Sequence, residues 1–384
     1  MAGRLLLVLG VPLRGGAEEY ALTVGRAAAA RGWCVHAALP FAPGTETLRR
    51  DLQAAGIDVS AIACVDRLAR DDPEPSTWAR LRAAAGLARA ARRFRPDVVH
   101  VTLTWPTFCF PYLLASAVLG LPTFVAFQLV PDGLYVRRRR RLVYAWIRGR
   151  GQRWIAVSDH GRRLIGALFA MDPAAIGVIH NGAPARGDDG HDGRGATRAE
   201  LGVGADAPLL LSLGRLHPQK GQVELVHAVA GVHAERPDVQ LLIAGDGPER
   251  ERLEELIDGL GVRDTVRLLG HRTDAARLMD AADLFVFPSH LEGTPFAMLE
   301  AMAHGLPVVA AAFGGAEEVV QDGRTGRLVP VGDPDALRGA ILGALADREE
   351  LGRIAAAGRE RAAAFSEDAM IDATLRELEG LRAA

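Results

Sequence analysis

The stretch GRLHPQKGQ, residues 214–222, holds the only lysine of the chain, Lys220, among 45 basic side chains. Arg215 lies five residues before it, and a helix is expected to begin near Gln222. Two cations beside a helix N-terminus suit a diphosphate, because positive charge and backbone N–H groups both favour phosphate oxygens. A compact ammonium also fits between phosphate oxygens where a planar guanidinium does not. The pattern therefore indicates a diphosphate site, with a solvated loop lysine as the alternative.

The segment PSHLEGTPFAMLEAMAHGLPVV supplies two carboxylates, Glu292 and Glu300. We expect Thr294 as the N-cap of a helix, Pro295 as its first residue and Gly305 just past its end, which places Glu292 in a loop. On one continuous helix, the two glutamates would lie about 12 Å apart along the axis. Glycosidase carboxylate pairs are about 5 to 9.5 Å apart, so we expect hydrogen bonds to a polyhydroxylated ligand rather than hydrolysis. Two solvated surface glutamates are the alternative.

The elements that must position these residues follow from the pattern of apolar runs. Short runs rich in Val, Leu and Ile alternate with amphipathic helical segments, which is typical of parallel sheets covered on both faces. The first half offers RLLLVLG, CVHAAL, DVVHVT, TFVAFQ, WIAVS and IGVIHN as strands, and the second half offers LLLSLG, VQLLIAG, TVRLLG, DLFVFPS, PVVAAA and GRLVPV. The fold class is therefore α/β, with two doubly wound Rossmann-like domains facing across a cleft and ligands at the carboxyl ends of the strands.

The chain of 384 residues is too long for one ordinary core. We expect an N-terminal domain over 1–184, a glycine-rich linker or exposed loop over 185–198, a C-terminal domain over 199–365, and a C-terminal helix over 366–384 that could pack on the N-terminal domain. Residues 1–180 carry 24 arginines against 13 acidic side chains, and the remainder carries 21 basic against 34 acidic side chains. This asymmetry indicates that the two domains have different partners.

Other features limit where the protein works. Three widely separated cysteines, Cys34, Cys64 and Cys109, match no disulfide or metal-ligand spacing and fit a reducing compartment. The first apolar run is too short for a signal peptide. The uncharged stretch 101–130 is interrupted by prolines and is expected to form two strands and a short helix rather than a membrane span. We expect a cytoplasmic protein without a nucleic-acid partner, because the basic regions lack a recognisable nucleic-acid motif.

Five segments together resemble glycosyltransferase family 4 of the GT-B fold: LRGGAEEY, GRLHPQKGQ, LLIAGDGPE, PSHLEGTPFAMLEAMAHGLPVVA and GGAEEVVQDGRTGRLVPVGDPDAL. The resemblance covers nearly the whole chain and is most specific in the second half. It implies a retaining transferase that moves a sugar from a nucleotide-diphosphate donor, held by the second domain, to an acceptor on the first. The acceptor class is a glycan, a lipid-linked sugar or a small molecule.

The resemblance also implies roles at the matching positions. Arg215 and Lys220 would neutralise the departing diphosphate, Glu292 would bind hydroxyls of the transferred sugar, and Glu300 would hold the ribose. These cations make a metal unnecessary, and no cofactor is expected besides the donor. Backbone groups would contribute at Gly15 and Gly16 to the phosphates, at Gly270 and His271 to the nucleobase, and at Gly293, Thr294, Pro295 and Phe296 near the sugar.

The chain departs from the family at Gln128, where many members have a histidine. A glutamine can hydrogen-bond a sugar hydroxyl but carries neither a proton nor a charge. His100 lies near the same layer of strand ends and is either a ligand contact or a core histidine. A binding subunit that holds the nucleotide sugar without catalysis therefore stays an alternative, as does an epimerase or hydrolase of the same fold.

The excess positive charge of the first domain is concentrated in RRRRRLVYAWIRGRGQR, where Arg137, Arg138, Arg139, Arg140 and Arg141 precede an apolar pattern. Leu142, Val143, Trp146 and Ile147 recur at helical spacing. Two interpretations stay open. The helix packs this stripe on its own domain with a solvated basic face, or it docks on an anionic membrane surface and brings the acceptor half to a lipid-linked or phosphorylated acceptor.

Overall fold

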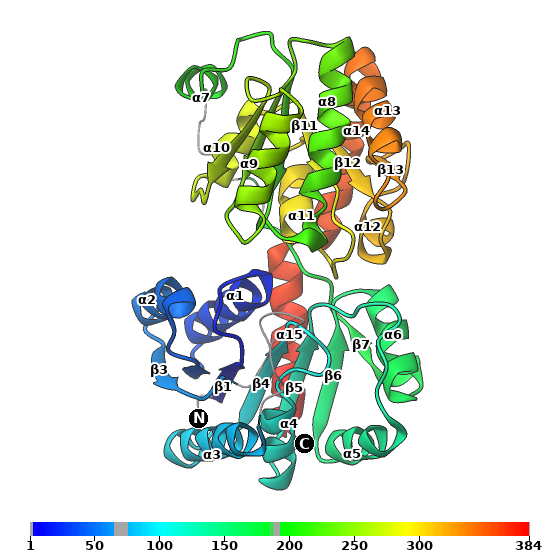
Figure 1. Ribbon diagram of the computed structural model, residues 1–384. Helices are drawn as coiled ribbons and strands as arrows, with labels where there is room; N and C mark the ends of the chain where they lie inside the picture. The colour runs from blue at the N-terminus through cyan, green and yellow to red at the C-terminus, as the bar shows by residue number, and fades with distance from the viewer. Residues whose placement is uncertain (1–2, 65–75, 185, 187–192, 384) are drawn as a thin grey trace. The chain divides into compact units, whose positions relative to one another are not determined.

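A computed structural model describes residues 3–64, 76–184, 186 and 193–383 (Figure 1). The chain divides into two compact units, one built from Met1–Asn181 together with Asp368–Ala384 and the other from Gly182–Glu367. Each unit contains one parallel sheet with helices on its faces. The predicted α/β class with two Rossmann-like domains is confirmed.

The sheet of the first unit has seven strands in the order β3-β2-β1-β4-β5-β6-β7, all paired in parallel. The chain order reverses beside β1, which is the doubly wound arrangement. The strands are β1 (Arg4–Leu9), β2 (Cys34–Leu39), β3 (Asp58–Ala61), β4 (Val98–Leu103), β5 (Thr123–Phe127), β6 (Gln152–Ala156) and β7 (Gly177–Val178).

The central strands of this sheet are buried on both faces. Val99, Val101 and Leu103 of β4 lie in one core cluster with apolar side chains of helices, while His100 of the same strand packs against Tyr20 on the opposite face. The helices that follow the strands are α1 (Gly16–Ala30), α2 (Glu46–Ala54), α3 (Thr77–Phe94), α4 (Phe110–Val118), α5 (Arg138–Arg148) and α6 (Asp159–Phe169).

The C-terminal helix α15 (Glu367–Ala383) packs on the first unit, far from it in sequence. The hydroxyl groups of Thr374 and Tyr20 lie 3.2 Å apart in the buried interface. Asp372 pairs with Arg31, the C-cap residue of α1. Glu377 accepts two hydrogen bonds from the Arg153 guanidinium, at 3.0 and 3.2 Å. The last helix therefore completes one face of the N-terminal sheet.

The sheet of the second unit has six parallel strands in the order β10-β9-β8-β11-β12-β13. Its strands are β8 (Leu209–Leu213), β9 (Gln240–Ala244), β10 (Val266–Gly270), β11 (Leu284–Phe287), β12 (Val308–Ala311) and β13 (Arg327–Val329). Its helices are α7 (Arg194–Glu200), α8 (Gln222–Glu235), α9 (Arg250–Gly259), α10 (Ala275–Ala281), α11 (Phe296–Ala303), α12 (Gly314–Val319), α13 (Pro334–Ala346) and α14 (Arg348–Ala362).

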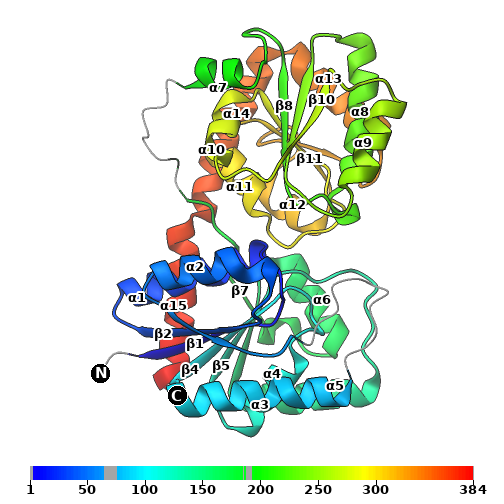
Figure 2. The same cartoon turned by 60° about the vertical axis from the view of Figure 1, so that its left-hand side comes forward.

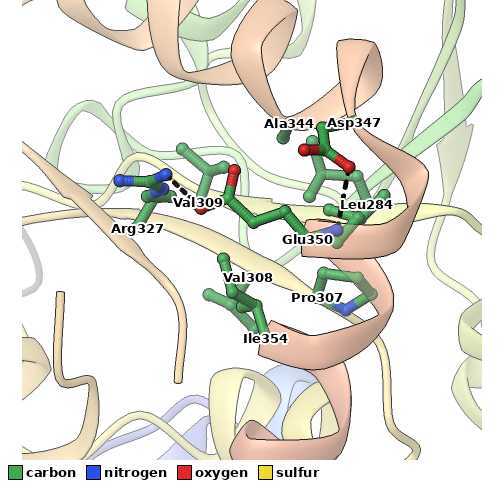
Figure 3. Close-up of a pocket in the computed structure, with 10 residues that line it drawn as sticks. Leu284, Pro307, Val308, Val309, Arg327, Ala344, Asp347, Glu350 and Ile354 are labelled. Carbon is green, nitrogen blue, oxygen red and sulfur yellow. Dashed lines mark hydrogen bonds and ion pairs between the residues drawn. The ribbon is translucent and has the colours of Figure 1, made fainter. Parts of the chain in front are cut away.

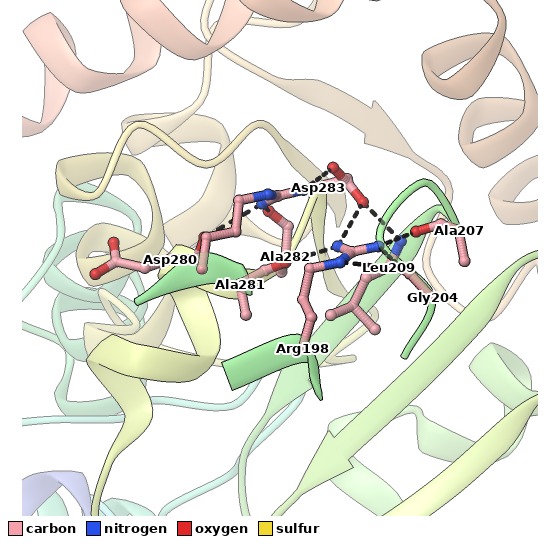
Figure 4. A network of polar contacts seen from close by, with 9 residues as sticks. Arg198, Gly204, Ala207, Leu209, Asp280, Ala281, Ala282 and Asp283 are labelled. Atoms are coloured by element: carbon pink, nitrogen blue, oxygen red, sulfur yellow. Dashed lines mark hydrogen bonds and ion pairs between the residues drawn. The ribbon is translucent and has the colours of Figure 1, made fainter. Parts of the chain in front are cut away.

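The expectation of an exposed loop over 185–198 is wrong from Arg194 on. Helix α7 begins at that residue and belongs to the second unit. The buried side chain of Arg198 attaches this helix to the rest of the second unit. Its guanidinium donates to the carbonyl oxygens of Gly204 at 2.8 Å and Ala281 at 2.9 Å, and pairs with Asp283 at 3.3 Å (Figure 4). A charged side chain that satisfies backbone carbonyls in this way anchors a helix that has little apolar surface. Residues 185 and 187–192 of the expected loop lie outside the described residues.

Each of the twelve expected runs contains a strand, and the structure adds β3, which the sequence did not suggest. Its sequence DVSA is short, and none of its residues is fully buried, because it forms the edge of the sheet. An edge strand lacks the continuous apolar run of a central one. In the uncharged stretch 101–130, the structure places the end of β4, helix α4 and strand β5. None of the helices in the described ranges has the length and apolar character needed to cross a membrane.

Candidate functional site

The loop between β8 and α8 carries Arg215 and Lys220. The chain leaves β8 at Leu213, turns at Gly214 and forms a short 3-10 turn, Pro218–Lys220, before α8 begins at Gln222. Gly221 adopts a left-handed conformation, with φ of 67°. This conformation suits glycine because it has no Cβ. The sequence therefore places Lys220 at the end of the 3-10 turn, with Gly221 as the N-cap between it and the 14-residue helix α8.

A second loop, between β11 and α11, is held directly against the first. The backbone N–H of His290 donates to the carbonyl oxygen of Gln219 at 2.8 Å. The Gln219 amide in turn donates to the carbonyl of Leu291. A carbon added at Gly221 would lie 2.1 Å from the carbonyl oxygen of Pro288, so the two backbones touch. These contacts fix the position of Lys220 relative to the loop that carries Glu292.

Lys220 and Glu292 form an ion pair between these two loops, and both side chains are half-buried. The Lys220 ammonium also lies 5.7 Å from the ring centroid of Phe287. Arg215 is exposed, and its backbone carbonyl accepts a hydrogen bond of 3.0 Å from the side chain of Gln222. Among the described residues, no acidic side chain pairs with Arg215. One guanidinium and one paired ammonium are thus available to an anion at the carboxyl edge of β8.

The charge of this loop acts on its own histidine. Burial lowers the pKa of His217, and the positive charges of Arg215 and Lys220 lower it further, although Glu249 opposes them. His217 Nδ1 also accepts a hydrogen bond of 3.3 Å from the backbone N–H of Gln219. The part of this lowering that comes from Arg215 and Lys220 reflects their positive charge beside His217, which is the sign that a diphosphate requires.

Helix α11 begins one residue later than the sequence suggested. Its N-cap is Pro295, with φ of −76° and ψ of 121°, and no side chain caps it, so the expected capping role of Thr294 is wrong. Thr294 is buried in the preceding loop. Proline suits the non-helical N-cap as well as the first helical position, because its fixed φ is compatible with both. Phe296 is the first helical residue, and Glu300 lies on the second turn as expected.

The loop before α11 is also closely packed at Gly293, whose carbonyl oxygen would lie 1.5 Å from a carbon added at Gly315. The N-terminal residues of α12 therefore approach the segment that contains Glu292. At the other end of α11, Gly305 follows the C-cap His304 with φ of 71°, as predicted.

The expected nucleobase positions lie at the end of β10 in the same sheet. Gly270 is the last residue of that strand, with φ of 72°, and its carbonyl accepts a hydrogen bond of 2.8 Å from the N–H of Gly245. His271 follows and is exposed. Because β8, β10 and β11 are parallel, their carboxyl ends share one edge of the sheet. The structure thus brings Gly270 and His271 to the edge that carries Lys220 and Glu292.

Sequence reasoning missed three glycines that make this edge compact. They are Gly245, Gly247 and Gly221. A carbon added to Gly245 would lie 1.9 Å from the carbonyl oxygen of Gly214, and one added to Gly247 would lie 2.3 Å from that of Leu216. A carbon added to Gly221 would lie 2.1 Å from the carbonyl oxygen of Pro288. The segment AGDG was visible in the sequence, but the identity of the neighbouring backbone was not. These glycines allow the three loops to pack without a side chain between them.

Two cavities lie in the second unit outside the paired residues. One of about 20 Å³, lined by Leu284, Val308, Ile354 and the Arg327–Glu350 pair, has room for about one water molecule (Figure 3). The other, of about 270 Å³, is lined in part by His217, Gln219, Glu224, Glu249 and His290. Lys220 and Glu292 line neither of these two cavities.

The first unit holds the remaining candidates. Gly15 is the N-cap of α1, and its N–H donates to the Glu18 carboxylate at 3.0 Å, while Gly16 is the first helical residue. The amide that was expected to reach a phosphate is therefore used by a carboxylate of its own helix. An acceptor at this position is what a helix N-terminus favours, so a phosphate would have to displace Glu18.

Gln128 directly follows β5 and is only 7% exposed. Its Oε1 accepts a hydrogen bond of 3.0 Å from Asn181 Nδ2, and among the described residues its Nε2 has no partner. The structure thus presents this amide as a donor at the carboxyl edge of the first sheet.

His100 is fully buried within β4, with its ring edge-on to Tyr20 at 5.6 Å and Phe124 at 4.9 Å between ring centroids. Burial lowers its pKa to about 3. Of the two interpretations left open by the sequence, the geometry favours a core histidine.

The five arginines stand at the start of α5, with Arg137 as its N-cap and Arg138 to Arg141 in its first turn. The expectation that the apolar residues after them form one continuous stripe on the helix is wrong, because these residues lie on different faces of α5. Ile147 is buried, but Leu142 and Trp146 are exposed, and the second buried position is Tyr144. Helix α5 therefore packs one apolar edge inward and shows another to solvent.

Comparison with known proteins supports the same division of the chain. The family described as "Glycosyl transferase 4-like domain" matches residues 15–182, and the family described as "Glycosyl transferases group 1" matches residues 194–361. The structure also resembles that of Alr3699/HepE from Anabaena in complex with UDP-glucose, with a TM-score of 0.81, 23% identity, and coverage of 98% of this chain and 99% of the other. The two sheets with their loops define a GT-B fold. The chain belongs to the GT-B glycosyltransferases of the family 4 type, as its sequence motifs suggested.

Two curated relatives show how far the similarity extends. The chain is 37% identical to the lipopolysaccharide core biosynthesis glycosyltransferase LpsE of Rhizobium meliloti over 182 residues, which are 47% of this chain and 52% of the relative. It is 36% identical to the D-inositol 3-phosphate glycosyltransferase of Streptomyces scabiei over 219 residues, which are 54% of this chain and 49% of the relative. The chain thus spans about half the length of the curated relatives it matches.

Proposed function

We propose that the chain is a retaining, metal-independent glycosyltransferase that moves a sugar from a nucleotide-diphosphate donor to an acceptor. The observation that carries this proposal is the ion pair of Glu292 with Lys220, whose loop also carries Arg215. The loops of both residues lie at the carboxyl edge of the six-stranded sheet in the second unit. A cation for phosphate and a carboxylate for sugar hydroxyls are the two groups that a nucleotide sugar needs at its reacting end.

Binding of the donor would exchange the partners of this ion pair. The Lys220 ammonium would turn from Glu292 to the diphosphate, and the Glu292 carboxylate would accept hydrogen bonds from sugar hydroxyls. When the bond between the anomeric carbon and the phosphate oxygen breaks, the leaving diphosphate gains negative charge. Arg215 and Lys220 would meet that charge in preorganised positions, which is the electrostatic form of catalysis.

The names of the relatives suggest classes of donor and acceptor. The Anabaena structure is described with UDP-glucose, and the two curated relatives are named for lipopolysaccharide core biosynthesis and for D-inositol 3-phosphate. A nucleotide sugar as donor, and a glycan, glycolipid or small molecule as acceptor, are consistent with all three. We also propose a cytoplasmic enzyme that works at the inner face of a membrane, because Arg137 to Arg141 are concentrated on one helix.

A second candidate is a subunit that binds the nucleotide sugar without catalysis. Gln128 favours it, because this amide cannot accept or deliver a proton as a histidine could. An epimerase or hydrolase of the same fold is a weaker candidate, since it would need further carboxylates near the sugar.

A thermal-shift screen against uridine, guanosine, adenosine and thymidine diphosphate sugars tests the donor site. A ligand at 100 times its Kd stabilises the folded state by about 2.7 kcal/mol and raises the melting temperature. Transfer is then measured with the donor that binds. Binding with transfer supports the enzyme, and binding without transfer to any glycan, lipid or polyol acceptor supports the binding subunit. If no nucleotide sugar shifts the melting temperature, both candidates are wrong.

A further inference from the structure

Three consecutive helices of the first unit lie on one side of its sheet. They are α3, α4 and α5, and α4 packs against both of the others. Figures 1 and 2 draw them together on that side. We call their outward surface, residues 76–95, 110–119 and 135–150, the three-helix face. Its inward side chains, such as Leu87, Tyr112 and Tyr144, belong to the same core cluster.

The three-helix face exposes most of the large apolar side chains that are exposed in the described part of the chain. Eight of eleven lie on it: Trp78, Leu81, Val118, Leu119, Tyr135, Leu142, Val143 and Trp146. Trp78 is 77% exposed, Val118 68% and Leu142 67%. One exposed leucine is ordinary on a protein surface, but a concentration of large apolar groups on one face marks an interaction site.

The same face carries a single sign of charge. Residues 76–95 contain six arginines, residues 137–150 contain seven, and neither segment nor the helix between them contains an acidic residue. Within the described residues, no carboxylate pairs with Arg92, Arg138 or Arg139, all of which are exposed. The positive charge of these side chains is therefore not neutralised by the surface that holds them.

Arginines and aromatic rings are interleaved on α5 and the segment before it. The Arg150 guanidinium lies 4.9 Å from the ring centroid of Trp146, and the Arg141 guanidinium lies 5.4 Å from that of Tyr135. Side chains with an apolar body and a polar or charged end are those that favour the boundary between lipid headgroups and acyl chains.

We propose that the three-helix face docks on an anionic lipid bilayer. The unpaired arginines match negative headgroups, and the exposed tryptophans and leucine match the apolar boundary beneath them. A partner that offered charge alone would leave Trp78, Leu142 and Trp146 in water, and an apolar protein partner would leave the arginines unpaired. This proposal rests on the membrane location put forward under the proposed function and deepens it, because it assigns the contact to a surface made by three helices. Docking does not require transfer, so a failure of either one can be told from a failure of the other.

Cosedimentation of the full chain with vesicles tests the docking, without donor or acceptor. Vesicles of phosphatidylcholine are compared with vesicles that also contain phosphatidylglycerol. We expect binding only to the anionic vesicles, reduced by added salt. The variant Arg92→Gln/Arg138→Gln/Arg139→Gln should bind about 100-fold more weakly, because each engaged arginine is worth about 1 kcal/mol and 1.4 kcal/mol is a factor of ten. The matched control Arg348→Gln/Arg353→Gln/Arg376→Gln should bind as the unchanged chain does.

A second pair of variants tests the apolar contribution at constant charge. Leu142→Ser/Trp146→Ser should bind at least about tenfold more weakly, since partial burial of two large side chains is lost. Leu260→Ser/Val331→Ser, which removes exposed apolar groups of the second unit, should have no effect. Equal binding to neutral and anionic vesicles, or no difference between the face variants and their controls, would overturn the proposal. So would a dimer that dissociates in Leu142→Ser/Trp146→Ser without any vesicle binding, because the face would then be covered by a second copy.

Discussion

Lys220 and Glu292 lie 72 positions apart in the sequence and form an ion pair between the loops that follow β8 and β11. These strands are neighbours in the sheet, so their carboxyl ends bring the two loops together. The pair is the contact that a nucleotide sugar would have to rearrange, and the first two predictions concern this site.

Lys220→Arg should impair transfer by about 10²- to 10³-fold, the usual cost of losing one well-placed group that meets developing charge. The guanidinium is larger and planar, and it cannot fit between Glu292 and the diphosphate in the position of the ammonium. Initial rates at saturating donor measure the effect, and thermal unfolding shows that the variant is folded. Arg236→Lys, the reverse exchange at a partly exposed position outside these loops, serves as the control. Transfer at the unchanged rate would show that Lys220 has no role at the phosphate.

Transfer should continue in excess chelator and should retain the anomeric configuration of the donor. In the proposed mechanism, Arg215 and Lys220 would supply the charge that a metal could otherwise provide. Rates with and without chelator test the first expectation, and the coupling of the anomeric proton in the product tests the second. An inverted product, or activity that disappears and is restored by magnesium, would contradict the mechanism.

Gly221→Ala should destabilise the second unit by more than about 2 kcal/mol, since a left-handed residue with a Cβ costs about 1 to 2 kcal/mol before any clash. The added carbon would also lie 2.1 Å from the carbonyl oxygen of Pro288. Gly343→Ala, in the last turn of α13 with open space around it, is the control and should stabilise by up to about 0.5 to 1 kcal/mol. Chemical denaturation measures both. An unchanged midpoint for Gly221→Ala would mean that the two loops are not packed as described.

Acid should destabilise the first unit through His100, because burial lowers the pKa of this histidine to about 3. Above pH 6.5 the histidine is neutral in both states and stability is independent of its titration. Between about pH 6.5 and 3, only the unfolded chain takes up the proton, so stability falls by about 1.4 kcal/mol per pH unit. His100→Phe, which keeps an aromatic ring beside Tyr20 and Phe124, should show a smaller slope in this window. The free energy of unfolding as a function of pH tests this, and equal slopes would assign the dependence to other groups.

Much of the fold was predictable from the sequence because it depends on local patterns. Buried strands such as LLLSLG and DLFVFPS are continuous apolar runs bounded by turn residues, and they were found where expected. The edge strand β3 was not, because a half-exposed strand of four residues has no such run. Helix α7 was missed for a related reason. It is held by hydrogen bonds from Arg198 to the carbonyl of nearby Gly204 and to that of Ala281, which is distant in sequence, rather than by an apolar face.

The chemical groups of the site were also readable from the chain, since a single lysine and two spaced glutamates are visible without a structure. Tertiary structure decided which of them meet. Lys220 faces Glu292 because β8 and β11 are adjacent, and their loops touch because Gly221 leaves room for the carbonyl of Pro288. It also decided that His100 is in the core and that α5 shows Leu142 and Trp146 to solvent while it buries Ile147. The physical reason is that residue type determines what a side chain can do, whereas strand order and close backbone packing determine what it contacts.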